Sequence, residues 1–202
     1  MADRQPKYPA RVSRRPTFCH WTINNNPDLH VDGPQWDLAG ICDLVGHYGG
    51  AHDIPGHADL DYIQLERQQP VDCIMPEWNA DALGNRTPFG PSIGEENETL
   101  RGDIITDIKT TINLASEREI PKVLLFFGEK SGDDTEAQWG RIDDELPGLA
   151  AHAEDKGVVL CFEPLNSVDF GNVPLAGMRG HPGQFNSNPY DFFEHLKKFG
   201  KP

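Results

Sequence analysis

VVLCFEPLNS, residues 158–167, is the stretch on which the interpretation of this chain depends. Five apolar residues lead directly into Glu163, and a proline, a leucine and an asparagine follow. Burying a charged group costs several kcal/mol unless the charge is paired or its pKa shifts. Two interpretations follow. Glu163 lies past the end of a strand, in water, or it lies at the mouth of a barrel and does chemistry there.

Similar short apolar runs recur along the chain and alternate with longer segments of helical periodicity. The strand-like runs are residues 16–23, 51–54, 71–75, 123–127 and 158–162. The helical patterns are residues 36–48, 57–69, 95–119, 136–155 and 190–199. Pro147 lies inside the fourth pattern, so that helix either kinks there or starts afresh. Five such strand–helix units predict an α/β fold with a parallel sheet covered on both faces.

Composition limits the partners that this protein can have. The 202 residues carry a formal net charge of −14, which argues against DNA or RNA as a partner because phosphates repel an acidic surface. Residues 1–16 are the exception, and we expect a basic, disordered tail there. No apolar run approaches the length of a membrane span. The N-terminal charges are not followed by an apolar signal segment, so we expect a cytoplasmic protein.

Four cysteines are present, and none forms a CxxC pair. They are Cys19, Cys42, Cys73 and Cys161, and we expect them to be buried thiols in a reducing compartment. No GxGxxG or P-loop sequence is present, so a nucleotide cofactor has no support. The histidines at positions 47, 52 and 57 recur every five residues. This spacing does not place them on one helix face, so a zinc cluster is the less favoured interpretation.

Polar side chains follow the predicted strands. In parallel α/β folds the active site lies at the carboxyl ends of the strands, so these residues are the candidates for chemistry. Acidic and imidazole groups that meet at one rim suit a divalent metal or acid–base catalysis. The candidates are His20, Trp21, His52, Asp53, Glu77, Glu129, Lys130, Glu163 and Asn166.

The segment LCFEPLNS at residues 160–167, followed by His181-Pro182-Gly183, resembles the hydroxypyruvate isomerase group of xylose isomerase-like TIM barrels. The segments FCHW at 18–21, LFFG at 125–128 and AEDKG at 153–157 are similar to this group as well. The resemblance implies a TIM barrel that isomerises an aldose and a ketose, with hydroxypyruvate or a small sugar as substrate. It also implies that Glu163 is the catalytic base. In the related ketose 3-epimerases the matching glutamate additionally binds a divalent metal, Mg²⁺ or Mn²⁺. The expected substrate-binding residues are His20, Lys130, Asn166, Asp169 and His181.

The chemistry supports this assignment independently of the resemblance. Moving a proton between adjacent carbons through an enediolate requires a base and a group that stabilises the developing negative charge. Apolar walls such as Phe162 would raise the pKa of Glu163 toward the pH at which it works. Such a base accelerates a reaction roughly a hundred- to ten-thousand-fold. A metal or the cationic side chain of Lys130 would stabilise the enediolate.

One departure from the family concerns length. A full barrel has eight strand–helix units, and residues 17–202 account for about five of them. The chain is therefore a fragment of a longer gene product, a protein completed by a partner chain such as a second copy, or an inactive barrel fragment that at most binds a sugar. A ketose 3-epimerase is a further alternative. So is a metal-dependent phosphodiesterase acting on damaged DNA, against which the acidity counts.

Overall fold

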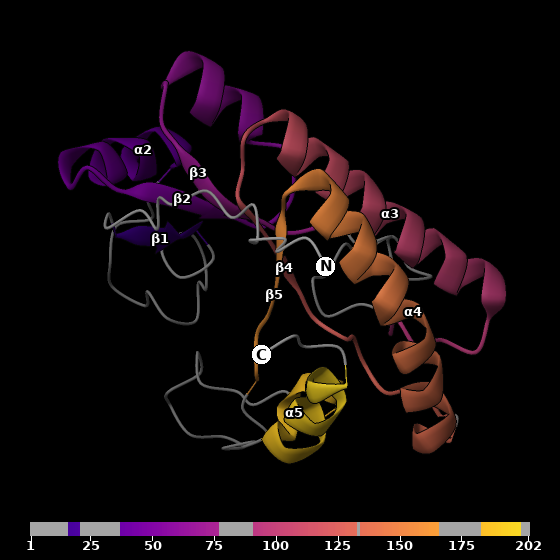
Figure 1. The fold of residues 1–202 in the computed structure, drawn as a ribbon. Helices are drawn as coiled ribbons and strands as arrows, with labels where there is room; N and C mark the ends of the chain where they lie inside the picture. The colour runs from indigo at the N-terminus through magenta and orange to yellow at the C-terminus, as the bar shows by residue number, and fades with distance from the viewer. Residues whose placement is uncertain (1–15, 21–36, 77–90, 133, 166–182, 199–202) are drawn as a thin grey trace, which may run out of the picture.

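The structure, a computed structural model, describes residues 16–20, 37–76, 91–132, 134–165 and 183–198. These residues contain one five-stranded sheet with the order β1-β2-β3-β4-β5 (Figure 1). All four neighbouring pairs are parallel. The strands are β1 (Thr17–Cys19), β2 (Ala51–Ile54), β3 (Val71–Ile74), β4 (Lys122–Leu125) and β5 (Val159–Phe162). All five expected strands are therefore present, in the expected parallel arrangement.

The helices follow the strands in alternation. They are α2 (Leu38–His47), α3 (Glu98–Glu117), α4 (Thr135–Lys156) and α5 (Pro189–Lys197). Side-chain caps start the first three, because the carboxylate or amide oxygen of Asp37, Asn97 or Asp134 accepts from a backbone N–H of the first turn. Pro147 lies inside α4, which continues on both sides of it, so the helix does not start afresh there.

The expected helix at residues 57–69 is confirmed in part. Residues 60 and 61 are helical and lead into the π-helix η1 (Tyr62–Glu66), whereas residues 57–59 and 67–69 are not helical. The expected basic tail, residues 1–16, lies outside the described residues except for Pro16. The carbonyl oxygen of Pro16 accepts a hydrogen bond from the Ala51 N–H at 2.9 Å, so pairing with the sheet already begins at that residue.

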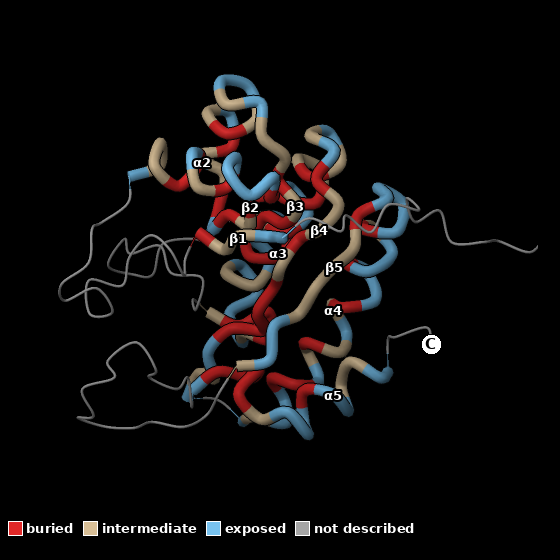
Figure 2. The backbone as a smooth tube through the Cα atoms, turned by 90° about the vertical axis from the view of Figure 1, so that its left-hand side faces the viewer, coloured by how far each residue is buried: buried red, intermediate tan, exposed pale blue. Residues whose placement is uncertain are grey.

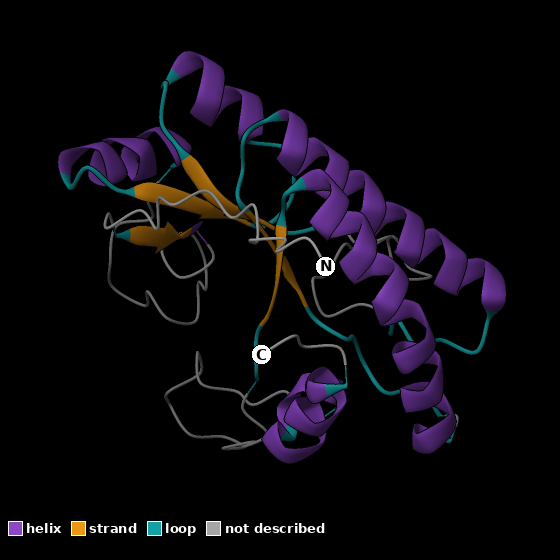
Figure 3. Ribbon diagram, viewed as in Figure 1, coloured by secondary structure: helices purple, strands orange, loops and turns teal. Residues whose placement is uncertain are grey.

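The helices lie along one side of a curved sheet (Figure 3). Alternate strand residues such as Ile54, Ile74 and Val123 face them and are almost completely buried. From the helices, Ile108 of α3 and Ile142 of α4 enter the same core. Figure 2 shows the buried segments gathered where the strands meet α3 and α4. The described helices thus cover one face, not the two expected, and the other face corresponds to the inside of a barrel.

An aromatic cluster fixes the region just beyond β4. The ring of Phe127 lies 5.5 Å from that of Trp139 in α4, 5.0 Å from Phe162 of β5 and 5.6 Å from Phe192 of α5. Each aromatic pair at this spacing stabilises the fold by about 0.5–1.5 kcal/mol beyond the contribution of the area that it buries. The cluster joins β4, β5, α4 and α5, and so it supports the strand ends near Glu163.

None of the described helices is both long enough and apolar enough to cross a bilayer.

Candidate functional site at the strand ends

Glu163 directly follows Phe162, the last residue of β5. Its backbone N–H donates to the Leu125 carbonyl at 3.4 Å, so it continues the β4–β5 pairing by one residue. Its side chain is exposed, so the expected dry enclosure is not present around it in the described structure. Partial desolvation nevertheless raises the pKa of Glu163, and the negative charge of Asp53 raises it further. The direction of the pKa shift is the expected one.

Asn186 holds the backbone at Glu163 in place. This residue is fully buried, and its side-chain Nδ2 donates to the Glu163 carbonyl at 2.7 Å. Its Oδ1 accepts from the Phe127 N–H at 2.7 Å, and its own carbonyl accepts from the Leu165 N–H at 2.9 Å. One side chain therefore joins the ends of β4 and β5. The sequence gives no signal for this role, because it depends on a contact between residues far apart in the chain.

Asp53 lies on the inner face of the sheet, near the end of β2. The strand register places it beside Cys19 of β1 and Cys73 of β3. Both thiols hydrogen-bond to its carboxylate. Burial raises the pKa of Asp53, and the two hydrogen bonds offset part of that increase. A second carboxylate thus occupies the same face of the sheet as the expected base.

The four cysteines lie in two different environments. Cys42 of α2 and Cys73 are buried as expected, whereas Cys19 and Cys161 are only partly buried. All four are free thiols. Burial raises the pKa of the Cys73 and Cys161 thiols, which keeps them protonated at neutral pH.

A partly exposed ion pair lies nearby, formed by Asp72 and Lys122. The Lys122 Nζ donates to Asp72 Oδ2 at 2.6 Å, and the Thr17 hydroxyl donates to the same oxygen at 3.0 Å. The hydrogen bond to Asp72 raises the pKa of Lys122. This pair ties together the inner faces of β1, β3 and β4.

His20 occupies a buried position with a protein partner. It is 2% exposed, and its Nε2 lies 2.6 Å from Nδ1 of His52, which is 0% exposed. His52 Nε2 in turn lies 2.9 Å from Gln69 Oε1, and the Gln69 amide donates to the Cys42 carbonyl of α2. This chain of contacts leads to the helix layer, away from Asp53. The described structure therefore gives His20 a packing role, and its substrate contact stays a prediction.

The tautomers of both histidines follow from this chain of hydrogen bonds. Because the Gln69 nitrogen donates to a carbonyl, its oxygen must accept, and His52 carries its proton on Nε2. His52 Nδ1 then accepts from the Nε2–H of His20. Burial, with the neighbouring histidine as a smaller cause, lowers the pKa of His20 to about 4, and burial also lowers the pKa of His52. Both rings are therefore neutral at pH 7.

The remaining expected contacts are only partly described. The Lys130 N–H donates to the Gly183 carbonyl at 2.8 Å, and its ammonium lies 5.6 Å from the centre of the Phe185 ring. No described contact joins Lys130 to Glu163. Asn166, Asp169 and His181 lie outside the described residues. Their roles stay predictions.

The described residues do not form a metal centre by themselves. No group of three or more His, Cys, Asp or Glu side chains among them is arranged to hold a metal ion. The three histidines considered for zinc lie in separate environments. His47 packs on Tyr48, His52 pairs with His20, and His57 contacts the Thr111 hydroxyl.

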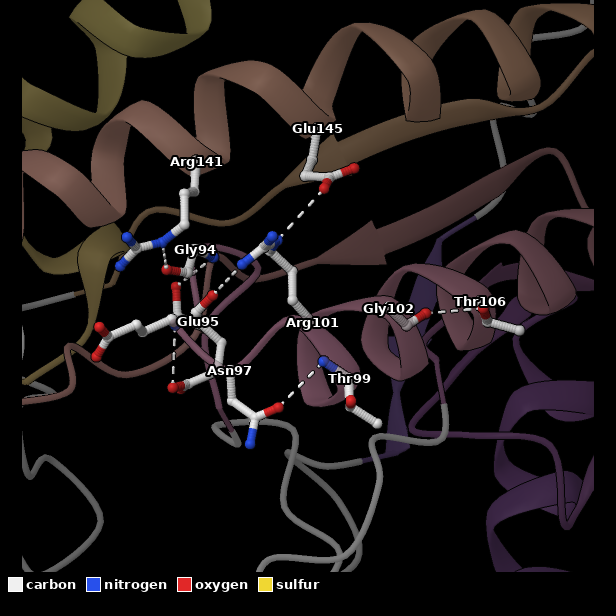
Figure 4. Close-up of polar contacts among 11 residues, drawn as sticks. Gly94, Glu95, Asn97, Thr99, Arg101, Gly102, Thr106, Arg141 and Glu145 are labelled. Carbon is white, nitrogen blue, oxygen red and sulfur yellow. Dashed lines mark hydrogen bonds and ion pairs between the residues drawn. The ribbon is translucent and has the colours of Figure 1, made fainter.

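The loop after β3 is fastened to α3 and α4 (Figure 4). Arg141 of α4 donates from Nε to the Gly94 carbonyl at 2.7 Å, and Arg101 of α3 donates to the Glu95 carbonyl at 2.6 Å. Arg101 also approaches Glu145 of α4 to 3.4 Å. These contacts fix the point at which the chain enters α3, beside the rim that contains Glu163.

Comparison with known proteins identifies the fold. No protein-family model and no curated protein sequence matches this chain. Among solved structures, an L-ribulose 3-epimerase matches with a TM-score of 0.59 at 14% identity, over 93% of this chain and 57% of its own. A family 2 AP endonuclease from Brucella melitensis matches with a TM-score of 0.65 at 14% identity, over 93% of this chain and 66% of its own. A xylose isomerase domain protein from Planctomyces limnophilus matches with a TM-score of 0.52 at 10% identity, over 80% of this chain and 55% of its own.

The likeness at such low identity is one of fold. The parallel sheet and the matched structures together define an α/β fold of the TIM-barrel type, with five of its eight strand–helix units in the described residues. The chain spans about 57% to 66% of the length of the epimerase and endonuclease structures that it matches.

Proposed function

We propose that this protein is a sugar isomerase or epimerase that moves a proton on a small hydroxy-carbonyl compound, with Glu163 as the base. The supporting observation is the position of Glu163. It is a carboxylate of raised pKa at the carboxyl end of a parallel strand, where TIM barrels carry their catalytic groups. Structural neighbours such as the L-ribulose 3-epimerase and a D-allulose 3-epimerase from Methylomonas sp. support the same class of reaction.

The specific reaction that we propose is aldose–ketose isomerisation of hydroxypyruvate or a small sugar. The Glu163 carboxylate removes the proton from the carbon next to the carbonyl, which leaves an enediolate. Glu163 then returns that proton to the neighbouring carbon, while the hydroxyl proton moves to the former carbonyl oxygen, so the carbonyl and the hydroxyl exchange places. A raised pKa favours this role, because it makes the ionised carboxylate a stronger base. Return of the proton to the opposite face of the same carbon would give a ketose 3-epimerase, which is the alternative.

The resemblance also suggested that Glu163 binds Mg²⁺ or Mn²⁺. The described residues do not fit that expectation on their own, since they provide no group of three suitable side chains. We therefore derive no step through a metal. Phosphodiester cleavage is less favoured, even though an AP endonuclease shares the fold, because a net charge of −14 repels DNA.

The test is the substitution Glu163→Gln, made in the complete gene product. Glutamine keeps the size and the hydrogen bonds of the side chain but cannot accept the carbon proton. We expect the rate of isomerisation of hydroxypyruvate or a ketose to fall by roughly a hundred- to ten-thousand-fold, with folding unchanged by circular dichroism. Assays with and without a chelator show separately whether a metal is required.

Glu117→Gln is the matched control. Glu117 is exposed in the last turn of α3, so Glu117→Gln makes the same chemical change at a position away from the strand ends. We expect unchanged activity there. Activity of Glu163→Gln within a few-fold of the parent would remove Glu163 from the mechanism. A parent protein with no isomerase or epimerase activity, but with measurable sugar binding, would instead favour the inactive-fragment alternative.

A further inference from the structure

We propose that Asn186 is a positioning residue of the candidate site. Its side-chain amide takes the place of the next hydrogen bond between β4 and β5, and in this way it determines where Glu163 lies. The position of the amide is a property of the fold, and its importance for turnover rests on the proposed function. Asn186 belongs to the short 3-10 helix η3 (Phe185–Ser187), 23 residues after Glu163 in the chain.

The pairing of β4 with β5 is regular as far as Glu163. The two strands are parallel, with Leu125 beside Phe162, and the Glu163 N–H donates to the Leu125 carbonyl. In a parallel ladder the hydrogen bonds are evenly spaced, and alternate residues of one strand bond to the same neighbour. Continued pairing would therefore join the Phe127 N–H directly to the Glu163 carbonyl. The last regular bond is already 3.4 Å long, which indicates that the strands begin to separate there.

A side-chain amide lies where that next bond would form. The Phe127 N–H donates to Asn186 Oδ1 at 2.7 Å, and Asn186 Nδ2 donates to the Glu163 carbonyl at 2.7 Å. An asparagine amide carries an acceptor and donors, so it can bridge an N–H and a carbonyl as a peptide group does. Two strands bridged by an inserted group lie further apart than two strands that bond directly. Asn186 therefore acts as a spacer between the strand ends.

This spacer is itself held in place. Asn186 is 0% exposed, so the loss of either hydrogen bond would leave a buried polar group unsatisfied. Phe185, before it, is also 0% exposed and donates its N–H to the Gly128 carbonyl at 3.1 Å. The Ser187 hydroxyl, after it, donates to the Gln184 carbonyl at 2.6 Å. Contacts on both sides of Asn186 thus fix its backbone.

The hydrogen bonds on both sides of the Glu163 Cα fix the direction in which its side chain leaves the backbone. Leu125 binds the N–H of Glu163, and Asn186 binds its carbonyl. Pro164 has no N–H, so the Leu165 N–H, which donates to the Asn186 carbonyl at 2.9 Å, is the next donor that can hold the chain. Displacing a catalytic group by about 1 Å can cost about a hundredfold in rate. Asn186 therefore affects turnover through the position of Glu163.

The substitution Asn186→Asp tests this role without any substrate. Aspartate has nearly the same shape and can still accept from the Phe127 N–H, but an ionised carboxylate cannot donate to the Glu163 carbonyl. By NMR we expect hydrogen exchange at the Leu165 N–H to become about tenfold faster or more, because the strand ends are released. Exchange at Ile108, which is buried in α3, should keep its rate. Asn186→Leu, which removes both the donor and the acceptor, should give the same result.

Gln64→Glu is the matched control. The Gln64 amide donates to the Arg118 carbonyl at 3.0 Å, so this variant makes the same amide-to-carboxylate change at a hydrogen bond away from the strand ends. We expect it to leave both exchange at Leu165 and turnover unchanged.

Kinetics of the complete gene product test the link to turnover. Asn186→Asp should lower kcat roughly ten- to a hundredfold, with KM within about threefold of the parent, because binding is not what the amide controls. In the Glu163→Gln background the same change should have no further effect, since the group that it positions is already absent. A merely structural role would lower activity equally in both backgrounds, and this result would overturn the proposal.

Unchanged exchange at Leu165 in folded Asn186→Asp and Asn186→Leu proteins also overturns it. Should neither variant fold, NMR couplings through hydrogen bonds decide in the unmutated protein. A coupling between Asn186 Nδ2 and the Glu163 carbonyl carbon supports the inserted amide, and a coupling from the Phe127 nitrogen to that carbon instead, or none, overturns it. The two proposals fail separately. Faster exchange in a protein without isomerase activity refutes only the proposed function, and activity that depends on Glu163 but not on Asn186 refutes only the positioning role.

Discussion

At the scale of single residues, the His20–His52 pair links the stability of the protein to pH. Both rings are neutral and buried in the folded chain, while an unfolded histidine has a pKa near 6.5. The folded pKa of His20, about 4, lies below the unfolded value. Between these two values the unfolded chain binds more protons than the folded chain. Stability is therefore complete above pH 6.5 and is lost as the pH falls toward 4.

We predict that His20 alone lowers the free energy of unfolding by about 2 kcal/mol between pH 7.5 and pH 5, as a pKa shift of this size requires. Urea denaturation at a series of pH values measures it. Raised carboxylate pKa values at Asp53 and Glu163 act in the opposite direction, so the decisive comparison is with His20→Asn. The pH dependence should be shallower in that variant, and an identical dependence in both proteins contradicts the prediction.

At the scale of secondary-structure elements, the entry into α3 depends on close backbone contact at Gly94. A Cβ atom placed there would lie 2.4 Å from the carbonyl oxygen of Gln138 in α4. Because this oxygen belongs to the backbone, α4 itself would have to move. The hydrogen bonds from Arg101 and Arg141 hold the segment at this distance (Figure 4).

We therefore predict that Gly94→Ala destabilises the protein by roughly 1–3 kcal/mol, the usual cost of overpacking. Gly102→Ala is the control, since Gly102 lies inside α3 with nothing within 4 Å of the added Cβ. That change should be neutral or stabilising by up to about 1 kcal/mol. Thermal unfolding of both variants measures the two changes in stability. A Gly94→Ala protein as stable as the parent refutes the close-contact argument.

Element type was predictable from the sequence where periodicity is strong. The apolar spacing of α3 predicts a helix, and the continuous apolar run of β5 predicts a strand; both predictions are confirmed. For the segment at residues 57–69 the helix was predictable, but its shorter extent, residues 60–66, and its π-helical form were not, because the apolar spacing fits a longer α-helix equally well. For the site, the sequence identifies Glu163 through its position after a strand. It does not identify the hydrogen bond from Asn186 that holds the backbone at Glu163, since this depends on a contact between residues far apart in the chain.

At the scale of the whole molecule, the described sheet is open. Among the described strands, β1 and β5 each have a neighbour on one side only, and a closed barrel leaves no such edges. In the described residues the inner face carries exposed and half-buried side chains such as Thr17, Lys122 and Glu163. A polar inner face of this kind is suited to a hollow that further strands enclose.

We accordingly predict that the 202-residue chain by itself shows no isomerase turnover. The described residues hold five strand–helix units and leave Glu163 exposed, and an exposed base loses the desolvation that makes it effective. Enzyme assays on the chain, with size-exclusion chromatography and light scattering to establish its oligomeric state, provide the measurement. Turnover that appears only in a dimer would show that a second copy completes the site. Robust turnover by a monodisperse monomer contradicts the prediction.

The fastening of the chain by Asn186 has a consequence for how this protein can evolve. Asn186 binds the backbone at both Glu163 and Leu165, so residues 166–185 begin and end at the same point of the structure. If Glu163 is the proposed base, insertions or replacements between Leu165 and Asn186 can alter which compound is recognised while Glu163 keeps its place. Recognition and reactivity are thereby free to diverge independently.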